Sequence, residues 1–334
     1  MSTPADELTA PNSMSSLNTR LRRPADLKEP VLDIVVLGAR LEEQEALQKE
    51  FERHADQVAT QQLEDRMKAA LYDGLPVYAM KDLSSSSGGK TISVGVIECT
   101  DMGNVAAAIN TAYAICEYRP SLIIFSGIAG ALDSGNIRIG DVIFPRTIVT
   151  RDFNKLKSFE GEFDALEDSD KNESLSHLKA KLHSYQRTVS ISERAKKVLT
   201  RIQSDTVNSE LRNENIPAEW LREFAIPARA PHVIHEEAAF SWNAVLSNEP
   251  YVRFLKKHIG NAWTSVEMES YGFLSAVERV KNIFHTDGLV IRAISDFAQH
   301  KDLSRSDPKW RKLGLANMAI ATRCVIERAF SRVY

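Results

Sequence analysis

Short apolar runs alternate along the chain with longer stretches in which apolar residues recur every three or four positions. The runs are rich in Val and Ile, as strands buried on both faces are; they lie at 31–39, 91–100, 121–132, 140–149 and 288–294. The longer stretches have the spacing or composition of helices; they lie at 40–54, 103–118, 266–280 and 309–332. This alternation predicts an α/β fold around a largely buried sheet.

The helix predicted after residue 103 carries an amphipathic pattern. Steps of three and four join its apolar residues into one stripe, made of Val105, Ala106, Ile109, Ala112, Tyr113 and Cys116. We expect this stripe to be the buried face of the helix, which ends before Pro120.

Three segments do not follow the alternation. Residues 1–29 are rich in Ser, Thr, Pro and charge, which predicts a disordered tail, with a short partner-binding arm as the alternative. Residues 83–90 contain "SSSSGG" and are interpreted as a flexible, hairpin-like connection. Residues 152–230 are polar and helix-prone, and we interpret them as an insertion within a single domain that spans 30–334.

The inserted segment holds a few apolar residues of its own, namely Trp220, Leu221, Phe224 and Ile226. Such side chains either fold back on the main sheet or bury against a partner, and the sequence leaves both alternatives open.

Composition excludes several classes of protein. A formal net charge of −3 gives no reason to expect nucleic acid or an anionic membrane as partner. Cys99, Cys116 and Cys324 form no CxxC pair, which suits a reducing cytoplasm and argues against disulfides or a zinc cluster. The histidines show no metal-ligand spacing, no apolar run approaches the roughly 18 residues of a membrane span, and the N-terminus lacks the apolar core of a secretory signal.

Two turns near the N-terminus are candidates for chemistry, because α/β folds build sites at strand ends. Glu42 and Glu43 follow the first strand, although the helix dipole alone favours acids there. Thr100 and Gly103 belong to a turn that opens a helix, which can present N–H groups to an anion or a hydroxyl, or can be a plain turn.

Two further candidates lie near the C-terminus. Glu267 and Glu269 point about 200° apart on a helix, so one is expected to face a cleft, where the two hydroxyls of a ribose could serve as donors; the alternative is a solvated helix start. Arg292 stands in an apolar strand and requires a carboxylate or polar pocket. Ser295 and Asp296 end that strand, where Asp296 either caps the next turn or faces a site.

The order of these segments along the chain resembles the nucleoside phosphorylase superfamily, and most closely its methylthioadenosine/S-adenosylhomocysteine nucleosidase branch. The matching segments are "LGARLEEQEAL", "TDMGNVAAA", "IIFSGIAGALDSGNIRIGDVI", "VEMES" and "VIRAISDFA". The resemblance covers about 31–150 and 231–330. It implies one phosphorylase-like α/β domain with a mixed, partly barrel-like central sheet flanked by helices.

The resemblance also implies a role for each matching residue. Asp296 would be the general acid at N7 of a purine, because a protonated base leaves more readily. Glu43 would orient the attacking water, and Glu269 would bind the ribose 2′- and 3′-hydroxyls above Met268. The water, ribose and base contacts would be completed by Arg292, Thr100, Glu267, Ser295, Gly127, Ala129 and Phe240, with Phe240 stacking on the base.

Two departures from the family pattern bear on the nucleophile and the substrate. Asp101 replaces a usual glycine and would repel phosphate, and the neighbours of Arg40 do not match the phosphate-holding motif of phosphorylases. Both favour water as nucleophile. The insertion stands where relatives build the 5′ side of the substrate site, so that pocket is not carried over. Its basic residues either meet a 5′-phosphate or form a solvated face; they are Lys179, Lys181, Arg187, Arg194, Lys196, Lys197 and Arg201.

The sequence therefore predicts a cytoplasmic purine nucleosidase that hydrolyses a nucleoside or nucleotide to free base and a ribosyl product, without metal or cofactor. A homodimer is expected, because relatives complete the 5′ side with a neighbouring subunit. Two alternatives stay open: a phosphate-dependent phosphorylase, and a nucleotide-sensing or effector subunit of a larger assembly.

Overall fold

A computed structural model describes residues 30–72, 74–84, 90–99, 101–132, 135–151, 186–223, 226–242, 263–298 and 307–334. The predicted tail 1–29, residues 152–185 of the insertion, Thr100 and Phe224 lie outside the described residues. The strands are β1 (Ile34–Gly38), β2 (Val77–Lys81), β3 (Thr91–Glu98), β4 (Leu122–Ala131), β5 (Val142–Arg151), β6 (Gln186–Ser190), β7 (Val233–Ser241), β8 (Trp263–Glu267) and β9 (Asp287–Phe297). The helices are α1 (Leu41–His54), α2 (Gln57–Ala69), α3 (Asn104–Tyr118), α6 (Glu193–Arg201), α7 (Ser204–Glu210), α8 (Ala218–Glu223), α10 (Ser270–Phe284), α12 (Lys309–Ala329) and the 3₁₀ turn η4 (Phe330–Arg332).

The described strands form one mixed sheet of nine strands that closes on itself. β4 pairs with β8, β8 with β7, β7 with β5, β5 with β9, and β9 again with β4. Closure of this ring removes the free edges of its strands. β1, β3 and β2 extend the sheet beyond β4, and β6 pairs with β5. The predicted mixed, partly barrel-like sheet is thus confirmed.

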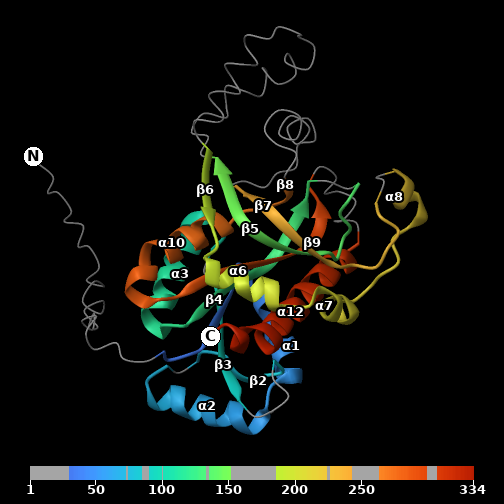
Figure 1. Cartoon of the computed structure of the whole chain (residues 1–334). Coiled ribbons are helices and arrows are strands. Elements are labelled where there is room, and N and C mark those ends of the chain that lie inside the picture. Colours follow the sequence, from blue (N-terminus) through green and yellow to red (C-terminus); the bar gives the residue numbers. More distant parts are fainter. Residues whose placement is uncertain are drawn as a thin grey trace, which may run out of the picture.

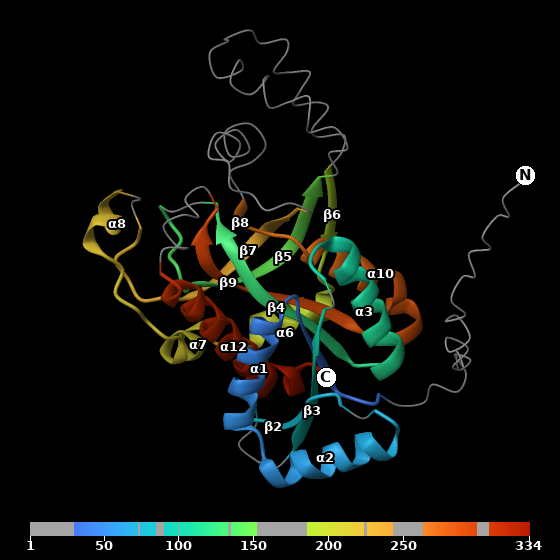
Figure 2. The ribbon, with the colours of Figure 1, turned by 180° about the vertical axis from the view of Figure 1, so that it is seen from behind.

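The apolar character of β1, β4 and β9 follows from their place between two layers of helices. Every residue of β1 is buried, as are nearly all residues of β4 and β9. Helices α3 and α10 lie on one side of these strands, and α1, α12 and α7 lie on the other (Figures 1 and 2). The three strands are mutually parallel where they pair, so their carboxyl ends meet at one edge of the sheet. The candidate residues after these strands are therefore brought together.

Helix α2 and strand β2 have no counterpart in the sequence-based prediction. Asp56 caps α2 by accepting a hydrogen bond from the N–H of Ala59 at 3.1 Å, and Leu63 and Met67 bury one face of the helix. β2 pairs with β3 in antiparallel fashion. The segment 83–90 between them therefore connects a hairpin, as expected, although residues 85–89 lie outside the described part.

The predicted buried face of α3 is wrong. Val105, Ile109 and Tyr113 are 72%, 64% and 59% exposed, whereas the buried side is formed by the small or polar residues Asn104, Ala107, Thr111 and Ala114 together with Ile115 and Tyr118. Small side chains let α3 approach α10 closely: a Cβ built on Gly272 of α10 would come 1.8 Å from the carbonyl oxygen of Asn104. The larger apolar residues consequently face outward.

The described part of the insertion packs on the main body of the chain. Ile216 and Ile226 are buried in a core cluster with the end of β9, and the ring of Trp220 lies 5.7 Å from that of Trp310 in α12. Of the two alternatives for these apolar residues, folding back is the one observed. The division of the chain into a tail and one domain with an insertion stays a prediction.

A buried ion cluster holds α7 of the insertion to α12 and α1. Arg323 donates from Nε to Glu50 at 2.9 Å and from Nη1 to Glu327 at 2.6 Å, and its Nη2 bonds Glu210 of α7. Arg328 also donates to Glu210, at 2.8 Å. Each of the three carboxylates thus has a guanidinium partner.

Among the described helices, none has the length and the apolar content that crossing a bilayer requires.

Candidate active site

The carboxyl end of β9 is bent by a bulge at Ser295. Ala129 of β4 pairs with Ile294, but the next residue, Gly130, pairs with Asp296, so Ser295 is the extra residue. A bulge re-aims the side chains beside it. Ser295 Oγ donates to Asp296 Oδ2 at 3.1 Å, and Asp296 Oδ1 is buried with no hydrogen-bond partner among the described residues. One oxygen of this acid is therefore held, while the other keeps its hydrogen-bonding capacity at the pocket.

Glu267 and Arg292 form a buried ion pair behind the pocket. Arg292 Nη2 lies 2.7 Å from Glu267 Oε2, and both side chains are 1% exposed. The same oxygen accepts from the backbone N–H groups of Glu269 and Ser270 at 2.9 and 2.8 Å and from Ser270 Oγ at 2.8 Å. These donors offset the cost of burying the charge. Of the two acids in "VEMES", Glu267 is thus the structural one.

Glu269 is the other acid of that pair, and it borders the pocket. Its Oε1 accepts a 3.3 Å hydrogen bond from the N–H of Gly103, and its Oε2 lies 3.6 Å from Arg292 Nη2. Burial raises the pKa of Glu269 to about 7; Arg292 opposes this rise, and the charges of Glu267 and Glu43 add to it. Burial therefore makes this carboxyl group easier to protonate than an exposed glutamate.

The side chain of Glu43, in the first turn of α1, contacts the end of β4. Its Oε2 accepts from the N–H groups of Ala39 and Arg40 at 2.8 and 3.1 Å, and its Oε1 accepts from that of Ile128 at 2.9 Å. Burial raises its pKa, against the lowering effect of Arg292 and of these three N–H groups. Backbone donors fix the orientation of this carboxyl group toward the pocket.

Two glycines of β4 let these acids approach the strand. A Cβ on Gly127 would lie 2.1 Å from Arg292 Nη1 and 2.7 Å from Glu43 Oε1, and one on Gly130 would lie 2.8 Å from Asp296 Oδ1. Any side chain at either position would displace a charged group of the site.

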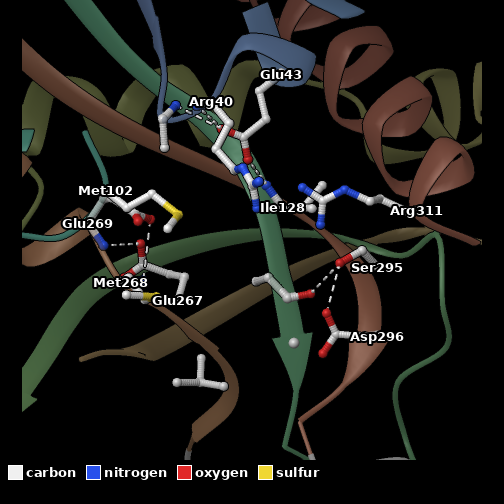
Figure 3. A pocket seen from close by; sticks show the side chains of 14 residues that line it. Arg40, Glu43, Met102, Ile128, Glu267, Met268, Glu269, Ser295, Asp296 and Arg311 are labelled. Carbon is white, nitrogen blue, oxygen red and sulfur yellow. Dashed lines mark hydrogen bonds between the residues drawn. The ribbon is translucent and has the colours of Figure 1, made fainter. Parts of the chain in front are cut away.

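The pocket between these groups draws its walls from β4, β8, β9, the turns after β1 and before α3 and α10, and the starts of α1 and α12. Glu269, Met268 and Met102 lie on one side, Ser295, Asp296 and Arg311 on the other, and Glu43 and Arg40 between them (Figure 3). The full lining comprises Ala39, Arg40, Glu43, Met102, Ile128, Ala129, Gly130, Val266, Glu267, Met268, Glu269, Ser295, Asp296 and Arg311. The structure thus gathers Asp296, Glu43, Glu269, Glu267, Met268, Ala129 and Ser295, which lie far apart in the sequence.

Three expected site residues do not line the pocket. Arg292 and Gly127 lie directly beneath it, in contact with Glu267 and Glu43. Phe240 is fully buried, with its ring 5.6 Å from that of Trp242, because its strand position turns it into the core. Phe240 is therefore not placed to stack on a base in this arrangement.

Other lining residues were missed from the sequence. Arg311 lies in the first turn of α12, after a segment with no matching motif, so nothing in the pattern points to it. Met102 belongs to the quoted "TDMGNV" turn, and its place next to Gly103 was a signal that could have been used. Asp101, beside it, is exposed and accepts from the N–H of Met102 at 2.7 Å.

The basic residues of α6 lie away from this pocket. Arg194 is 4.0 Å from Asp287, and its guanidinium lies 3.8 Å from the ring centroid of Tyr334. Asp287 begins β9, whereas Asp296 lies nine residues further along that extended strand, about 30 Å away. Arg194 therefore does not reach a ligand in the pocket of its own chain, and no basic residue of α6 lines that pocket; Lys179 and Lys181 lie outside the described residues.

No group of three or more His, Cys, Asp or Glu side chains in the described ranges has an arrangement that could hold a metal ion.

The sequence model of the phosphorylase superfamily matches residues 42–219, more than half of the chain. The chain belongs to the phosphorylase superfamily, which confirms the resemblance seen in its motifs. A search among curated protein sequences finds no match.

Solved structures with the same fold include three enzymes at low identity. The 5′-methylthioadenosine/S-adenosylhomocysteine nucleosidase of Neisseria meningitidis, in complex with methylthio-immucillin-A, is 20% identical with a TM-score of 0.52, over 88% of this chain and 98% of that one. The corresponding nucleosidase of Colwellia psychrerythraea, in complex with adenine, is 14% identical (TM-score 0.53; 91% and 96% covered). The futalosine hydrolase of Helicobacter pylori is 18% identical (TM-score 0.51; 88% and 97% covered). At these identities the likeness establishes the fold.

Proposed function

We propose that this protein hydrolyses the N-glycosidic bond of a purine nucleoside or nucleotide, releasing the free base and a ribosyl product. The observation that carries the proposal is the distribution of Asp296, Glu43 and Glu269 over separate walls of one pocket (Figure 3). The three acids can then act on three different parts of one substrate: the base, the attacking water and the sugar.

The acid at the base is Asp296. Its Oδ2 is held by Ser295, and its Oδ1 is buried without a partner among the described residues. The protonated carboxyl would donate its proton to N7 while the C1′–N9 bond breaks and the electron pair of that bond goes to the base. Because a purine anion leaves poorly, the added proton lowers the barrier.

The acid at the water is Glu43. Water attacks C1′ and forms the new C–O bond, and the proton that it loses passes to Glu43. A carboxylate held by three backbone donors needs no reorganisation to accept it, and a pKa raised by burial makes this carboxylate a stronger base. The negative charges of Glu43 and Glu269 would also stabilise the positive charge that develops on the sugar.

The acid at the sugar is Glu269, which would accept hydrogen bonds from the 2′- and 3′-hydroxyls, with Met268 beside the ring. The Glu269 carboxylate accepts hydrogen bonds from the N–H groups of Gly103 and Met268, at 3.3 Å each, and its remaining lone pairs can accept from the hydroxyls. A reducing cytoplasm is part of this proposal, supported by three cysteines that are all free thiols.

Product analysis tests the reaction. The purified protein would be incubated with purine nucleosides and their 5′-phosphates, with and without inorganic phosphate, and the products separated by chromatography. Free base together with ribose or ribose 5-phosphate, independent of added phosphate, is the expected result. Ribose 1-phosphate formed only with added phosphate would identify a phosphorylase, and tight binding without base release would identify a sensing module.

We also propose a homodimer with helix α3 at its interface. Met102, Val105, Ile109 and Tyr113 form an exposed apolar stripe along that helix, and its first member lines the pocket. Exposed apolar surface of this continuity is typical of an interface. A second copy covering the stripe would lie next to the pocket, in keeping with the arrangement that the family resemblance implies.

The variant Ile109→Glu tests this interface, with Val58→Glu as control because Val58 is equally exposed, on α2. Light scattering should give about twice the 37.3 kDa chain mass for the wild type and the control, and a lower mass for Ile109→Glu. A wild-type monomer, or a dimer that survives Ile109→Glu, contradicts the interface.

A further inference from the structure

The rim of the pocket holds two arginines around one carboxylate. Arg311, at the start of α12, donates to Glu42 in a bidentate pair, Nε to Oε2 at 2.6 Å and Nη2 to Oε1 at 2.8 Å. Arg40, at the N-cap of α1, has its Nε 3.6 Å from Glu42 Oε1. Both arginines line the pocket. We name this group the rim cluster: Arg40, Glu42 and Arg311.

The charges of the rim cluster do not cancel. Glu42 is ionised, because the hydrogen bond from Arg311 is the largest of the effects that hold its pKa below the usual value. Within these three residues, one carboxylate against two guanidinium groups leaves a net charge of about +1, although the pocket acids Glu43 and Asp296 also interact with Arg311. A single arginine would be enough to neutralise the charge of Glu42.

The rim cluster also keeps donors available. Arg311 commits Nε and Nη2 to Glu42, and its Nη1 has no hydrogen bond to any described residue. The side chain of Arg40 likewise makes an ion pair, but no hydrogen bond, within the described residues, and it is about half exposed. The bidentate pair fixes the plane of the Arg311 guanidinium, so little entropy is lost when its free edge binds an anion.

The position of the rim cluster relative to Glu269 identifies which part of a substrate it faces. The 2′- and 3′-hydroxyls and the 5′-carbon leave opposite edges of a ribose ring. Glu269 lies on one side of the pocket, and Arg311 lies on the other side together with Asp296 (Figure 3). In an anti purine nucleoside the C8–N7 edge of the base lies toward the 5′-carbon, so the residue that reaches N7 and the residue that reaches the 5′ group should be neighbours. Asp296 and Arg311 fulfil this requirement.

Resting on the proposed function, we infer that Arg40 and Arg311 bind the 5′-phosphate of the substrate, which is therefore a purine nucleoside 5′-phosphate rather than a nucleoside. The other ionisable groups that line the pocket, Glu43, Glu267, Glu269 and Asp296, are acids. Arg40 and Arg311 are therefore the cations through which the described lining of this pocket can bind an anionic group. Arg292 does not serve this purpose, because it is buried and paired with Glu267.

The first test compares a nucleotide with its nucleoside. The kcat/KM of base release would be measured for AMP and adenosine with the wild type, Arg311→Gln, Arg40→Gln and the control Lys312→Gln, which removes an exposed charge one position along α12. We expect the wild type to prefer AMP by at least about tenfold. Arg311→Gln should lower kcat/KM for AMP by about 10- to 100-fold more than for adenosine, the range for a charge-assisted hydrogen bond. The control should behave as the wild type.

Equal losses for AMP and adenosine in Arg311→Gln would overturn the inference and make Arg311 a positioning residue. A wild-type preference for adenosine would overturn it too, while the proposed hydrolase stands. The phosphate could instead be the nucleophile: if base release requires inorganic phosphate and yields ribose 1-phosphate, the arginines hold that phosphate, and the 5′-phosphate assignment is rejected.

A binding measurement separates this inference from the proposed reaction. The dissociation constants of AMP and adenosine would be measured by calorimetry with Asp296→Asn alone and with Asp296→Asn combined with Arg311→Gln. Tighter binding of AMP that is lost on adding Arg311→Gln supports the 5′-phosphate site even if no base is ever released. No difference between AMP and adenosine overturns the site even if hydrolysis is found.

Discussion

Arg292 and Arg323 are both buried among glutamates, yet their surroundings differ in one respect. Each of the three carboxylates around Arg323 has a guanidinium partner at hydrogen-bond distance. Of the glutamates described around Arg292, Glu267 accepts a hydrogen bond from it and Glu269 stands 3.6 Å away; Ser270 Oγ also accepts from Arg292, but Nη1 of Arg292 has no partner among the described residues. The same residue types thus make a closed cluster that fastens helices and an open one that borders a pocket. Unsatisfied buried groups beside a cavity are typical of functional sites.

The largest effect on activity is expected from Asp296→Asn, in the pocket that the open cluster borders. The amide cannot donate an acidic proton to N7, so kcat for base release should fall by about 10²- to 10⁴-fold while the fold is kept. Release of adenine measures the effect, and thermal unfolding verifies the fold. Asp205→Asn, an exposed carboxylate of α7, is the control. Near wild-type turnover in Asp296→Asn would remove this residue from the acid role.

Substitutions in the closed cluster around Arg323 should lower the stability of the protein rather than its catalytic activity. Arg323→Met leaves Glu327 and Glu50 buried without their guanidinium, which should cost about 3–5 kcal/mol of unfolding free energy. Activity per folded molecule should persist. Arg292→Met should be milder in stability, since Glu267 keeps three other donors, but should lose activity.

Urea unfolding and turnover on the same samples separate these effects, and the exposed Arg279→Met is the control. The distinction between a closed and an open cluster fails if Arg323→Met lowers turnover per folded molecule as much as Arg292→Met does.

The variant Glu269→Ala tests whether the open cluster binds the hydroxyls of the substrate's sugar. The proposed contacts to two hydroxyls predict that kcat/KM for a ribonucleoside or ribonucleotide falls at least about tenfold further than for the 2′-deoxy substrate. Parallel assays of both sugars measure the ratio. An equal fall for the two sugars would reject the ribose assignment.

The smallest effect concerns pH and the buried carboxyl of Glu269. Because its pKa rises from about 4.5 in the unfolded chain to about 7 in the folded protein, the folded state holds the extra proton between these values. Stability therefore falls as pH rises through that window. Glu269→Gln should flatten this dependence and raise the melting temperature at pH 8 by about 2–4 °C relative to wild type. Melting curves from pH 5 to 8 measure it, and identical slopes for the two proteins would contradict a raised pKa.

Much of this architecture follows from the sequence because strands buried between helices need continuous apolar runs. β1, β4 and β9 were predicted for that reason, and their parallel pairing brings Asp296 and Glu43 to one edge. The face of α3 could not be predicted, since periodicity marks an apolar stripe without stating what covers it. Arg311 could not be found either, because its contact with Glu42 joins residues 269 positions apart and follows no local spacing. Phe240 illustrates the same limit: a strand pattern does not tell which of two apolar faces borders a pocket.

The pairing of β5 with β6 determines how much a change in the length of residues 152–185 costs in folding free energy. Arg151 and Gln186, the residues on either side of 152–185, are partners in the ladder between the two strands. The scaffold itself thus holds the ends of that segment together. Doubling or halving its length would alter the free energy of loop closure by only about 0.6 kcal/mol. The site acids lie on other elements of the fold, so the segment between Arg151 and Gln186 could be lengthened or shortened at little cost to folding and without moving those acids.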